Sequence, residues 1–210
     1  MKKLLIQSIR MTIVFTILTG LVYPLAVTGV AQWAFPGQAN GSLIRREGQV
    51  IGTALLAQPF TRDGYFWPRP SAAGLATVPS GATNLGPTSA ALQSKVTERA
   101  KAFRAAHHLS DKTPVPADML FASGSGLDPH ISPEAARLQA GRVAAARSLG
   151  RDQVLAVVER MIEKPQLGLL GEPRVNVLHL NLALDGRLGS AVAETQASEV
   201  HYSHGRIQSP

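Results

Sequence analysis

A long stretch without charged side chains constrains this chain most. Residues 11–44 contain no Asp, Glu, Lys or Arg, and the strongly apolar part of the stretch covers residues 11–35. About 20 helical residues suffice to cross the roughly 30 Å hydrocarbon core of a bilayer. Because a helix satisfies its own backbone hydrogen bonds inside lipid, we predict one transmembrane helix over residues 11–35. We expect Pro24 to kink it, since proline lacks the N–H that would bond one turn back.

The charges that precede the span predict its orientation. Lys2, Lys3 and Arg10 come just before it, and basic residues that flank a span tend to remain in the cytoplasm. We therefore expect residues 1–10 to be cytoplasmic and residues 36–185 to form a domain on the periplasmic side. The lipid bilayer itself is therefore one predicted partner.

A cleaved signal peptide is the alternative interpretation of this N-terminus. Gly29-Val30-Ala31 is an acceptable small-residue cleavage site. The apolar cores of signal peptides usually cover about 7–15 residues, and this apolar run is longer. Length therefore favours a retained anchor over a signal peptide.

Composition excludes one further class of partner. The formal net charge is +7, but removing Lys2, Lys3 and Arg10 leaves 18 basic against 14 acidic side chains. A surplus that small, without a basic block, does not predict nucleic-acid binding. The absence of cysteine is compatible with an oxidising compartment and does not prove one.

The region after the span predicts an α/β (α+β) soluble domain carried on a single N-terminal transmembrane helix. Strands are expected over residues 42–46 and 49–56, as a hairpin around Glu47-Gly48. Turn-forming residues over 71–88 predict a long loop. Capping and apolar spacing predict three helices: from Thr88 or Ser89 to about His107, from Ser132 to about Leu149, and from Asp152 to a point before Pro165.

The end of the domain is predicted as a strand followed by a tail. Over residues 174–185 the apolar side chains alternate, with a slip of one residue at Val177-Leu178. Such a slip is typical of a β-bulge in a strand. Residues 186–210 have no sustained periodicity and are expected to be a flexible C-terminal tail.

The best candidate for a ligand or partner site is the loop over residues 123–130. Ser123, Ser125, Asp128 and His130 follow one another there, just before a capped helix. Loop hydroxyls and a helix start can hold an anion, and the Asp and His could act as base and acid or as metal ligands. The same residue types are also typical of a structural turn. Because spacing fixes no third ligand, we favour the turn and predict neither a metal site nor a catalytic residue.

Two other groups of residues are weaker candidates. Tyr65, Phe66, Trp67 and Arg69 lie on an extended, proline-flanked segment that is suited either to a protein interface or to core packing. Gln139 lies in a predicted helix and could be functional, although an exposed surface position is the default expectation. The sequence has no phosphate-binding GxxxxGK[ST] loop, no GxSxG elbow and no HExxH helix.

Several segments, taken in order, follow the pattern of one protein family. The most specific are Tyr65-Phe66-Trp67-Pro68-Arg69-Pro70-Ser71 and Ala122-Ser123-Gly124-Ser125-Gly126-Leu127-Asp128-Pro129-His130-Ile131-Ser132. The others are Tyr23-Pro24-Leu25, Thr28-Gly29, Asn84-Leu85-Gly86-Pro87, Val115-Pro116-Ala117-Asp118, residues 170–178 and residues 181–185. Together these segments resemble the C subunit of the Kdp high-affinity potassium-transporting ATPase (KdpC). The resemblance covers roughly residues 10–185. Ser80-Gly81-Ala82-Thr83 departs modestly from the family pattern.

The resemblance implies a place in an inner-membrane complex for potassium uptake. Its partners would be a channel-like potassium-binding subunit and a P-type ATPase subunit that is phosphorylated by ATP. The family member is a non-catalytic accessory subunit, needed for assembly and stability and regarded as a chaperone that raises the ATP affinity of the ATPase subunit. ATP, Mg²⁺ and K⁺ would belong to the complex rather than to this chain. The opposing hypothesis is a membrane-tethered periplasmic hydrolase or binding protein that uses the 123–130 loop.

Overall fold

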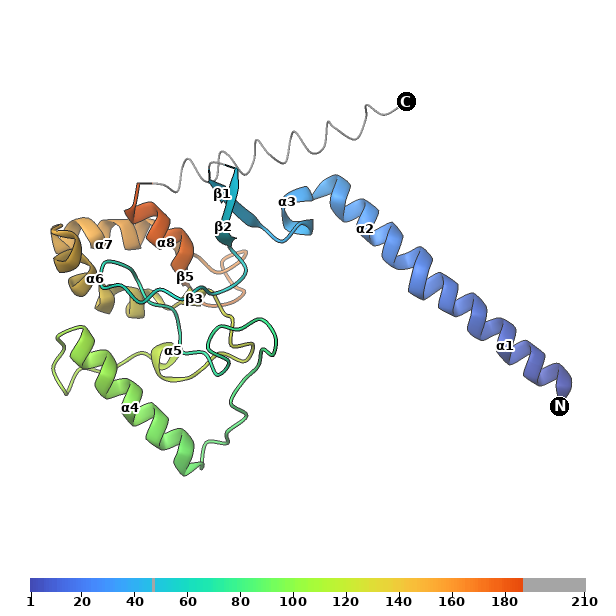
Figure 1. The fold of residues 1–210 in the computed structure, drawn as a ribbon, viewed down its shortest axis with the longest axis horizontal. Helices are drawn as coiled ribbons and strands as arrows, with labels where there is room; N and C mark the ends of the chain where they lie inside the picture. The colour runs from blue at the N-terminus through green and yellow to red at the C-terminus, as the bar shows by residue number, and fades with distance from the viewer. Residues whose placement is uncertain (47, 187–210) are drawn as a thin grey trace.

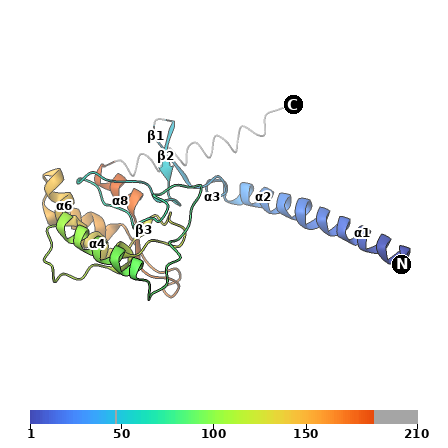
Figure 2. The same cartoon turned by 60° about the horizontal axis from the view of Figure 1, so that its bottom comes forward.

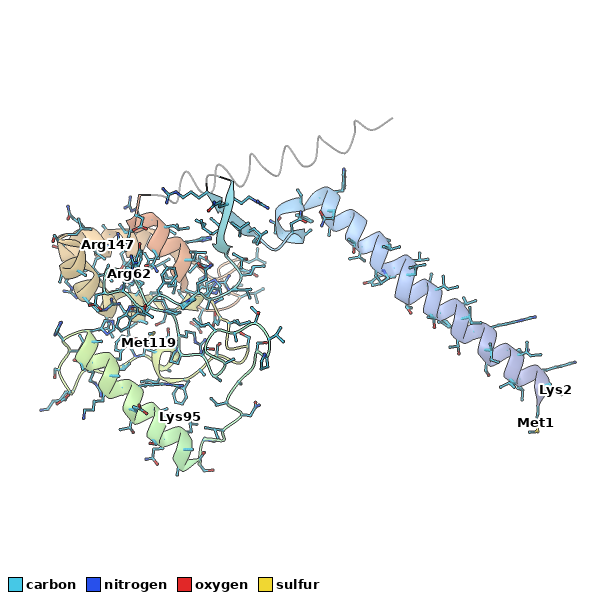
Figure 3. All side chains as sticks on the ribbon, viewed as in Figure 1. Met1, Lys2, Arg62, Lys95, Met119 and Arg147 are labelled. Carbon is cyan, nitrogen blue, oxygen red and sulfur yellow. The ribbon has the colours of Figure 1, made fainter. Side chains whose placement is uncertain are left out.

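The N-terminal part of the protein is a helical rod that projects away from a separate domain (Figure 1). The computed structural model describes residues 1–46 and 48–186. The rod consists of α1 (Lys2–Ile17), a π-helical turn η1 (Leu18–Val22) and α2 (Tyr23–Ala34). Among the residues described, this 33-residue rod is the one helix long and apolar enough to cross a membrane, and none of it is buried. Its side chains extend from the ribbon without protein around them, from Met1 and Lys2 onwards (Figure 3).

A π-helical turn precedes Pro24 in place of the expected kink. The backbone N–H of Tyr23 donates to the carbonyl of Leu18, five residues back, which makes a π-helical turn directly before the proline. The rod keeps one direction in both views (Figures 1 and 2). The missing proline N–H is therefore accommodated by local widening of the helix, one of the usual ways in which membrane helices absorb proline.

A short connection joins the rod to a β-hairpin. The helical turn α3 (Pro36–Ala39) leads into β1 (Leu43–Arg46) and β2 (Gln49–Thr53), which pair antiparallel. The register shifts between Ile44 and Arg45, as in a β-bulge. The predicted hairpin is confirmed, while Glu47 at its turn lies outside the described residues.

The rest of the domain mixes helices with a small antiparallel sheet. Its helices are α4 (Ala90–Ala106), α5 (Ala117–Leu120), α6 (Pro133–Arg147), α7 (Arg151–Arg160) and α8 (Val177–Leu184). The sheet has the order β3 (His130–Ile131), β5 (Arg174–Asn176), β4 (Ile162–Glu163). The largest fully buried apolar side chains come from both kinds of element and from the loop before α4: Phe66, Ile131, Val143, Val154, Val158, Val175 and Leu180. The predicted mixed class is confirmed at this level.

Helix caps explain why two of the predicted helices begin where they do. The Ser89 hydroxyl accepts from the N–H of Leu92, and the Ser132 hydroxyl accepts from the N–H of Ala135. Both satisfy a backbone donor that the first helical turn leaves free. The start of the third helix was predicted wrongly, because its cap is Gly150, whose N–H donates to the Gln153 side chain. Asp152 instead lies within the first turn.

The predicted strand over residues 174–185 is wrong for most of its length. Only Arg174–Asn176 is a strand, and α8 (Val177–Leu184) follows it directly. The Asn176 side chain accepts from the N–H of His179 and caps this helix. Leucine and alanine are strong helix formers, and burial of Val177, Leu180 and Asn181 follows helical spacing. Of the predicted tail, residues 187–210 lie outside the described residues.

Candidate functional site

The 123–130 loop lies between α5 and β3, and its hydroxyl groups accept hydrogen bonds from the loop itself. The Ser125 hydroxyl accepts from the N–H of Leu127 at 3.1 Å, and the Ser123 hydroxyl accepts from the N–H of Asp128 at 3.5 Å. The carbonyl of Leu127 accepts from the N–H of Ala57, 2.9 Å away, which joins the loop to the segment after β2. These are the bonds of a folded turn.

Asp128 is the charged centre of the loop. One carboxylate oxygen accepts from the Arg69 guanidinium at 2.7 Å. The other accepts from the backbone N–H of His130 at 3.0 Å and lies 3.3 Å from Nδ1 of the same residue. Burial alone would raise the pKa of Asp128, but the hydrogen bonds from His130 and Arg69 outweigh burial and lower it to about 2.

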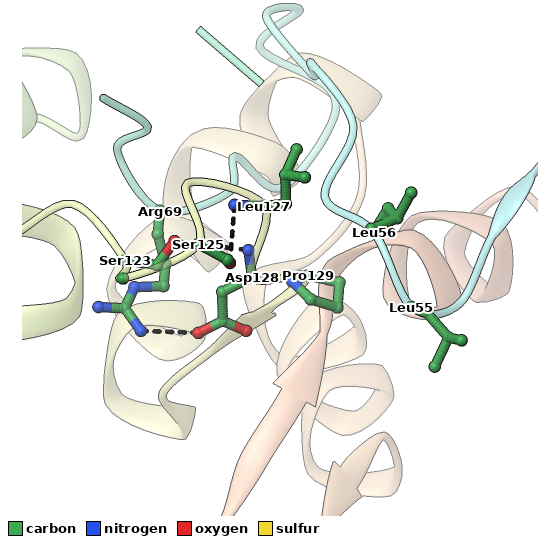
Figure 4. Close-up of a pocket in the computed structure, with 9 residues that line it drawn as sticks. Leu55, Leu56, Arg69, Ser123, Ser125, Leu127, Asp128 and Pro129 are labelled. Carbon is green, nitrogen blue, oxygen red and sulfur yellow. Dashed lines mark hydrogen bonds and ion pairs between the residues drawn. The ribbon is translucent and has the colours of Figure 1, made fainter. Parts of the chain in front are cut away.

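A shallow pocket of about 420 Å³ opens beside this carboxylate (Figure 4). Figure 4 shows the guanidinium of Arg69 turned toward Asp128, with Leu55 and Leu56 on the opposite wall. Apolar and polar side chains share the lining: Leu55, Leu56, Arg69, Ser123, Gly124, Ser125, Leu127, Asp128 and Pro129. The two charged side chains in this lining, Arg69 and Asp128, are paired with each other.

The structure brings the predicted Asp and His together in a chain of polar contacts. Nε2 of His130 lies 3.9 Å from the carboxylate of Glu163, which accepts from Arg174 at 2.9 Å. In the described residues the hydrogen bonds of Ser123 and Ser125 go to backbone groups of the loop, and neither hydroxyl is bonded to His130. A nucleophilic serine requires such a base. Within residues 1–46 and 48–186 no group of three His, Cys, Asp or Glu side chains could hold a metal ion.

If the loop is structural, Asp128 should stabilise the domain without being needed for transport. Its folded pKa lies below the ordinary value of 3.8, so its contribution is present above about pH 4 and is lost as the pH falls toward about 2. The shift corresponds to at most about 2.5 kcal/mol, which solvent screening reduces to about 1 kcal/mol.

The free energy of unfolding, measured in urea, should fall between about pH 5 and about pH 3. We therefore expect this fall to be smaller for Asp128→Asn than for the unaltered chain. If the chain is the transport subunit that its sequence resembles, potassium uptake by cells that carry the variant should be unchanged. Loss of uptake with unchanged unfolding and unchanged assembly would instead identify Asp128 as a functional residue.

The aromatic segment, for which an interface and core packing were both open, makes contacts within the domain. Phe66 is fully buried, the Tyr65 hydroxyl bonds to Asp185, and the Trp67 indole donates to the carbonyl of Arg62. Two buried amides hold the backbone of this segment. Asn181 accepts from the N–H of Phe66 and donates to its carbonyl, at 2.8 and 3.1 Å.

Gln139 holds the next residue in the same way. Its side chain accepts from the N–H of Trp67 at 2.8 Å and donates to the Trp67 carbonyl at 3.2 Å. Gln139 is fully buried, so the expectation of an exposed surface position is wrong. A buried extended backbone needs hydrogen-bond partners, and here the two amides replace a neighbouring strand.

Arg142 is a buried cation that the sequence analysis did not identify. It donates to the carbonyls of Asp63 and Tyr65 and stacks 3.9 Å from the ring centroid of Trp67. Burial lowers its pKa to about 10, and Asp63 opposes this shift. Its Nε lies 3.2 Å from Nε2 of His107, which must accept because a guanidinium only donates. Spacing along α6 places Arg142 one turn after Gln139, but nothing in the sequence indicates which loop it would contact.

Comparison with known proteins gives one consistent result. A family model described as KdpC, the c chain of the K⁺-transporting ATPase, matches residues 5–186. A potassium-transporting ATPase KdpC subunit of Rhodospirillum rubrum is 58% identical over 174 residues, covering 82% of this chain and 90% of the relative. Proteins of the same name from Myxococcus xanthus and Mycobacterium tuberculosis are each 51% identical over 187 residues. Each alignment covers 88% of this chain, with 88% and 99% of the respective relatives.

Proposed function

The chain belongs to the KdpC family of K⁺-transporting ATPase c chains, and from that premise we propose that it is a non-catalytic subunit that stabilises its complex and raises the ATP affinity of the P-type ATPase subunit. Membership makes it an accessory subunit of the Kdp complex, located at a membrane and associated with the other Kdp subunits. The potassium-binding channel-like subunit and the P-type ATPase subunit are the proposed direct partners.

The fully exposed apolar rod is the observation that carries the proposal. None of the side chains between Lys2 and Ala34 is buried by the domain, so the protein itself does not cover them. Lipid and the helices of multispan partners are the surroundings in which such a helix is stable. The candidate loop supports the same conclusion, because Asp128 is paired with Arg69 and His130 contacts Asp128 and Glu163 rather than a serine nucleophile.

The proposed effect on ATP affinity acts through the membrane. In the proposed orientation only residues 1–10 face the cytoplasm, where the nucleotide domains of P-type ATPases lie. Contact between this domain and nucleotide would therefore be impossible, and the subunit would instead favour one conformation of its partners. A coupling of about 1–3 kcal/mol changes affinity roughly 5–150-fold, so modest differential contacts along the rod suffice.

The orientation predicts opposite labelling of positions on the two sides of the membrane. Because the protein has no cysteine, single cysteines can be introduced at Ser94 on α4 and at Gln7 in the rod. We expect Ser94→Cys to react with a membrane-impermeant thiol reagent in cells with a permeabilised outer membrane, and Gln7→Cys to stay unreactive. The reverse pattern would place the domain in the cytoplasm and remove the reason for coupling through the membrane.

Co-purification tests the subunit function itself. Solubilised in mild detergent, a tagged chain should bring down large multispan partners that mass spectrometry identifies, and their ATP affinity should fall when the chain is omitted. A tethered hydrolase would purify alone and would turn over a small substrate. Purification of the folded chain without membrane partners would contradict the proposal.

A further inference from the structure

The turn between β4 and β5 exposes three leucines at its tip. Leu167, Leu169 and Leu170 are 91%, 87% and 61% exposed, and residues 165–171 carry no charged side chain. The hydrophobic effect normally removes such side chains from water, so a cluster at one tip indicates a surface that something covers. In Figures 1 and 2 this pale orange loop lies in the half of the domain nearer the apolar rod.

The backbone of this leucine turn (residues 166–170) is held by its own hydrogen bonds. Gln166 and Leu170 exchange two backbone bonds of 2.9 Å, and the N–H groups of Gly168 and Leu169 donate to the carbonyls of Pro165 and Gln166 at 3.1 Å. Leu167 and Gly168, with φ +55° and +75°, both have the left-handed conformation that closes the turn. The leucines are thus presented on a preformed turn, which lowers the cost of ordering the backbone on binding.

We propose that the leucine turn inserts into the surface of the lipid bilayer beside the domain, as a second membrane contact in addition to the rod. Ala34 ends the rod and Leu43 begins the domain, so residues 35–42 separate them. Fully extended, eight residues reach at most about 28 Å, which keeps the domain close to the membrane surface. α3 and the hydrogen bond between the side chains of Asn40 and Gln32 shorten this connection further.

The chemistry of the turn favours lipid over a pocket on a protein. Energetically important side chains at protein interfaces are enriched in Trp, Tyr and Arg, whereas leucine is under-represented there. Residues 165–171 offer none of these three types. Lipid cannot pair free backbone groups, and the leucine turn pairs most of its own. Lys164 at its base can meet anionic headgroups.

A fluorophore at the tip of the turn tests this contact directly. The full chain with Leu169→Cys, labelled with an environment-sensitive dye, is reconstituted alone into vesicles of phosphatidylethanolamine and phosphatidylglycerol. Leu149→Cys is the matched control, since Leu149 is another exposed leucine. It lies in the connection between α6 and α7, at the end of the domain away from the rod (Figure 1).

We expect the emission of the dye at position 169 to shift to the blue and to lose most of its intensity when the acyl chains are brominated. The dye at position 149 should emit as in water in both vesicles. Emission as in water from position 169 would overturn the proposal. A blue shift that occurs only after the other Kdp subunits are added would also overturn it, because the contact would then be with protein. Since no partner or nucleotide is present, the result does not depend on the proposed effect on ATP affinity.

Discussion

Replacing Gln139 with alanine should destabilise the domain by about 3–5 kcal/mol, a large share of the roughly 5–15 kcal/mol that holds a typical domain folded. The change leaves the N–H and the carbonyl of Trp67 without partners and removes one acceptor of the Arg142 guanidinium. Each unpaired buried group costs about 1–3 kcal/mol, and the fully buried side chain also leaves a cavity.

Urea unfolding followed by circular dichroism measures this loss, with Gln93→Ala as the control. Gln93 is an exposed glutamine on α4, so its removal should change the free energy of unfolding by less than about 0.5 kcal/mol. Equal stability of the two variants would contradict a structural role for Gln139 and would reopen its candidacy as a ligand or partner residue.

Gly126→Val should be the second strongly destabilising change, by about 2–4 kcal/mol. Gly126 has φ +72°, a backbone conformation that a β-branched residue rarely adopts. A Cβ at this position would also lie 2.9 Å from the carbonyl oxygen of Gly81 and 3.2 Å from the Ser71 hydroxyl. Strain and close contact therefore act together, and the loop that carries Asp128 should shift.

Gly124→Val is a matched control two residues away in the same loop. A Cβ at Gly124 would meet nothing within 4 Å, and its φ is not in the left-handed region. Thermal unfolding should separate the two variants clearly, with Gly124→Val close to the unaltered chain. Similar melting of both would mean that the loop conformation around Gly126 is not required for folding.

Helix caps and apolar spacing predicted the starts of two helices correctly. They failed over residues 177–184, where the apolar side chains fit both a strand and a helix. Ser89 and Ser132 are caps that satisfy specific N–H groups, so the starts of α4 and α6 could be predicted from neighbouring residues alone. In residues 177–184, leucines at every second position fit a strand, while the buried set fits a helix equally well. Asn176 favours the helix, because its side chain accepts from the N–H of His179 and caps α8.

The candidate site shows why contacts between distant segments escape sequence analysis. The 123–130 loop was identified from its residue types, but Arg69, which pairs with Asp128, was assigned to a separate candidate interface. Gln139 and Arg142 are polar positions on a helix, and their burial depends on an extended segment more than 70 residues earlier. Apolar spacing and helix caps relate residues that are close in the sequence. They contain no information on contacts between segments that are far apart in the sequence.

We propose that the chain changes the ATP affinity of its complex without binding nucleotide itself. Titration of Mg-ATP into the purified full-length chain in detergent, followed by calorimetry, tests that claim most directly. We predict no binding in the micromolar range, since the sequence has no GxxxxGK[ST] loop to hold phosphates and the domain is proposed to face a compartment away from the nucleotide. Saturable micromolar binding of Mg-ATP to the folded chain would contradict the claim and would show that the nucleotide contact is direct.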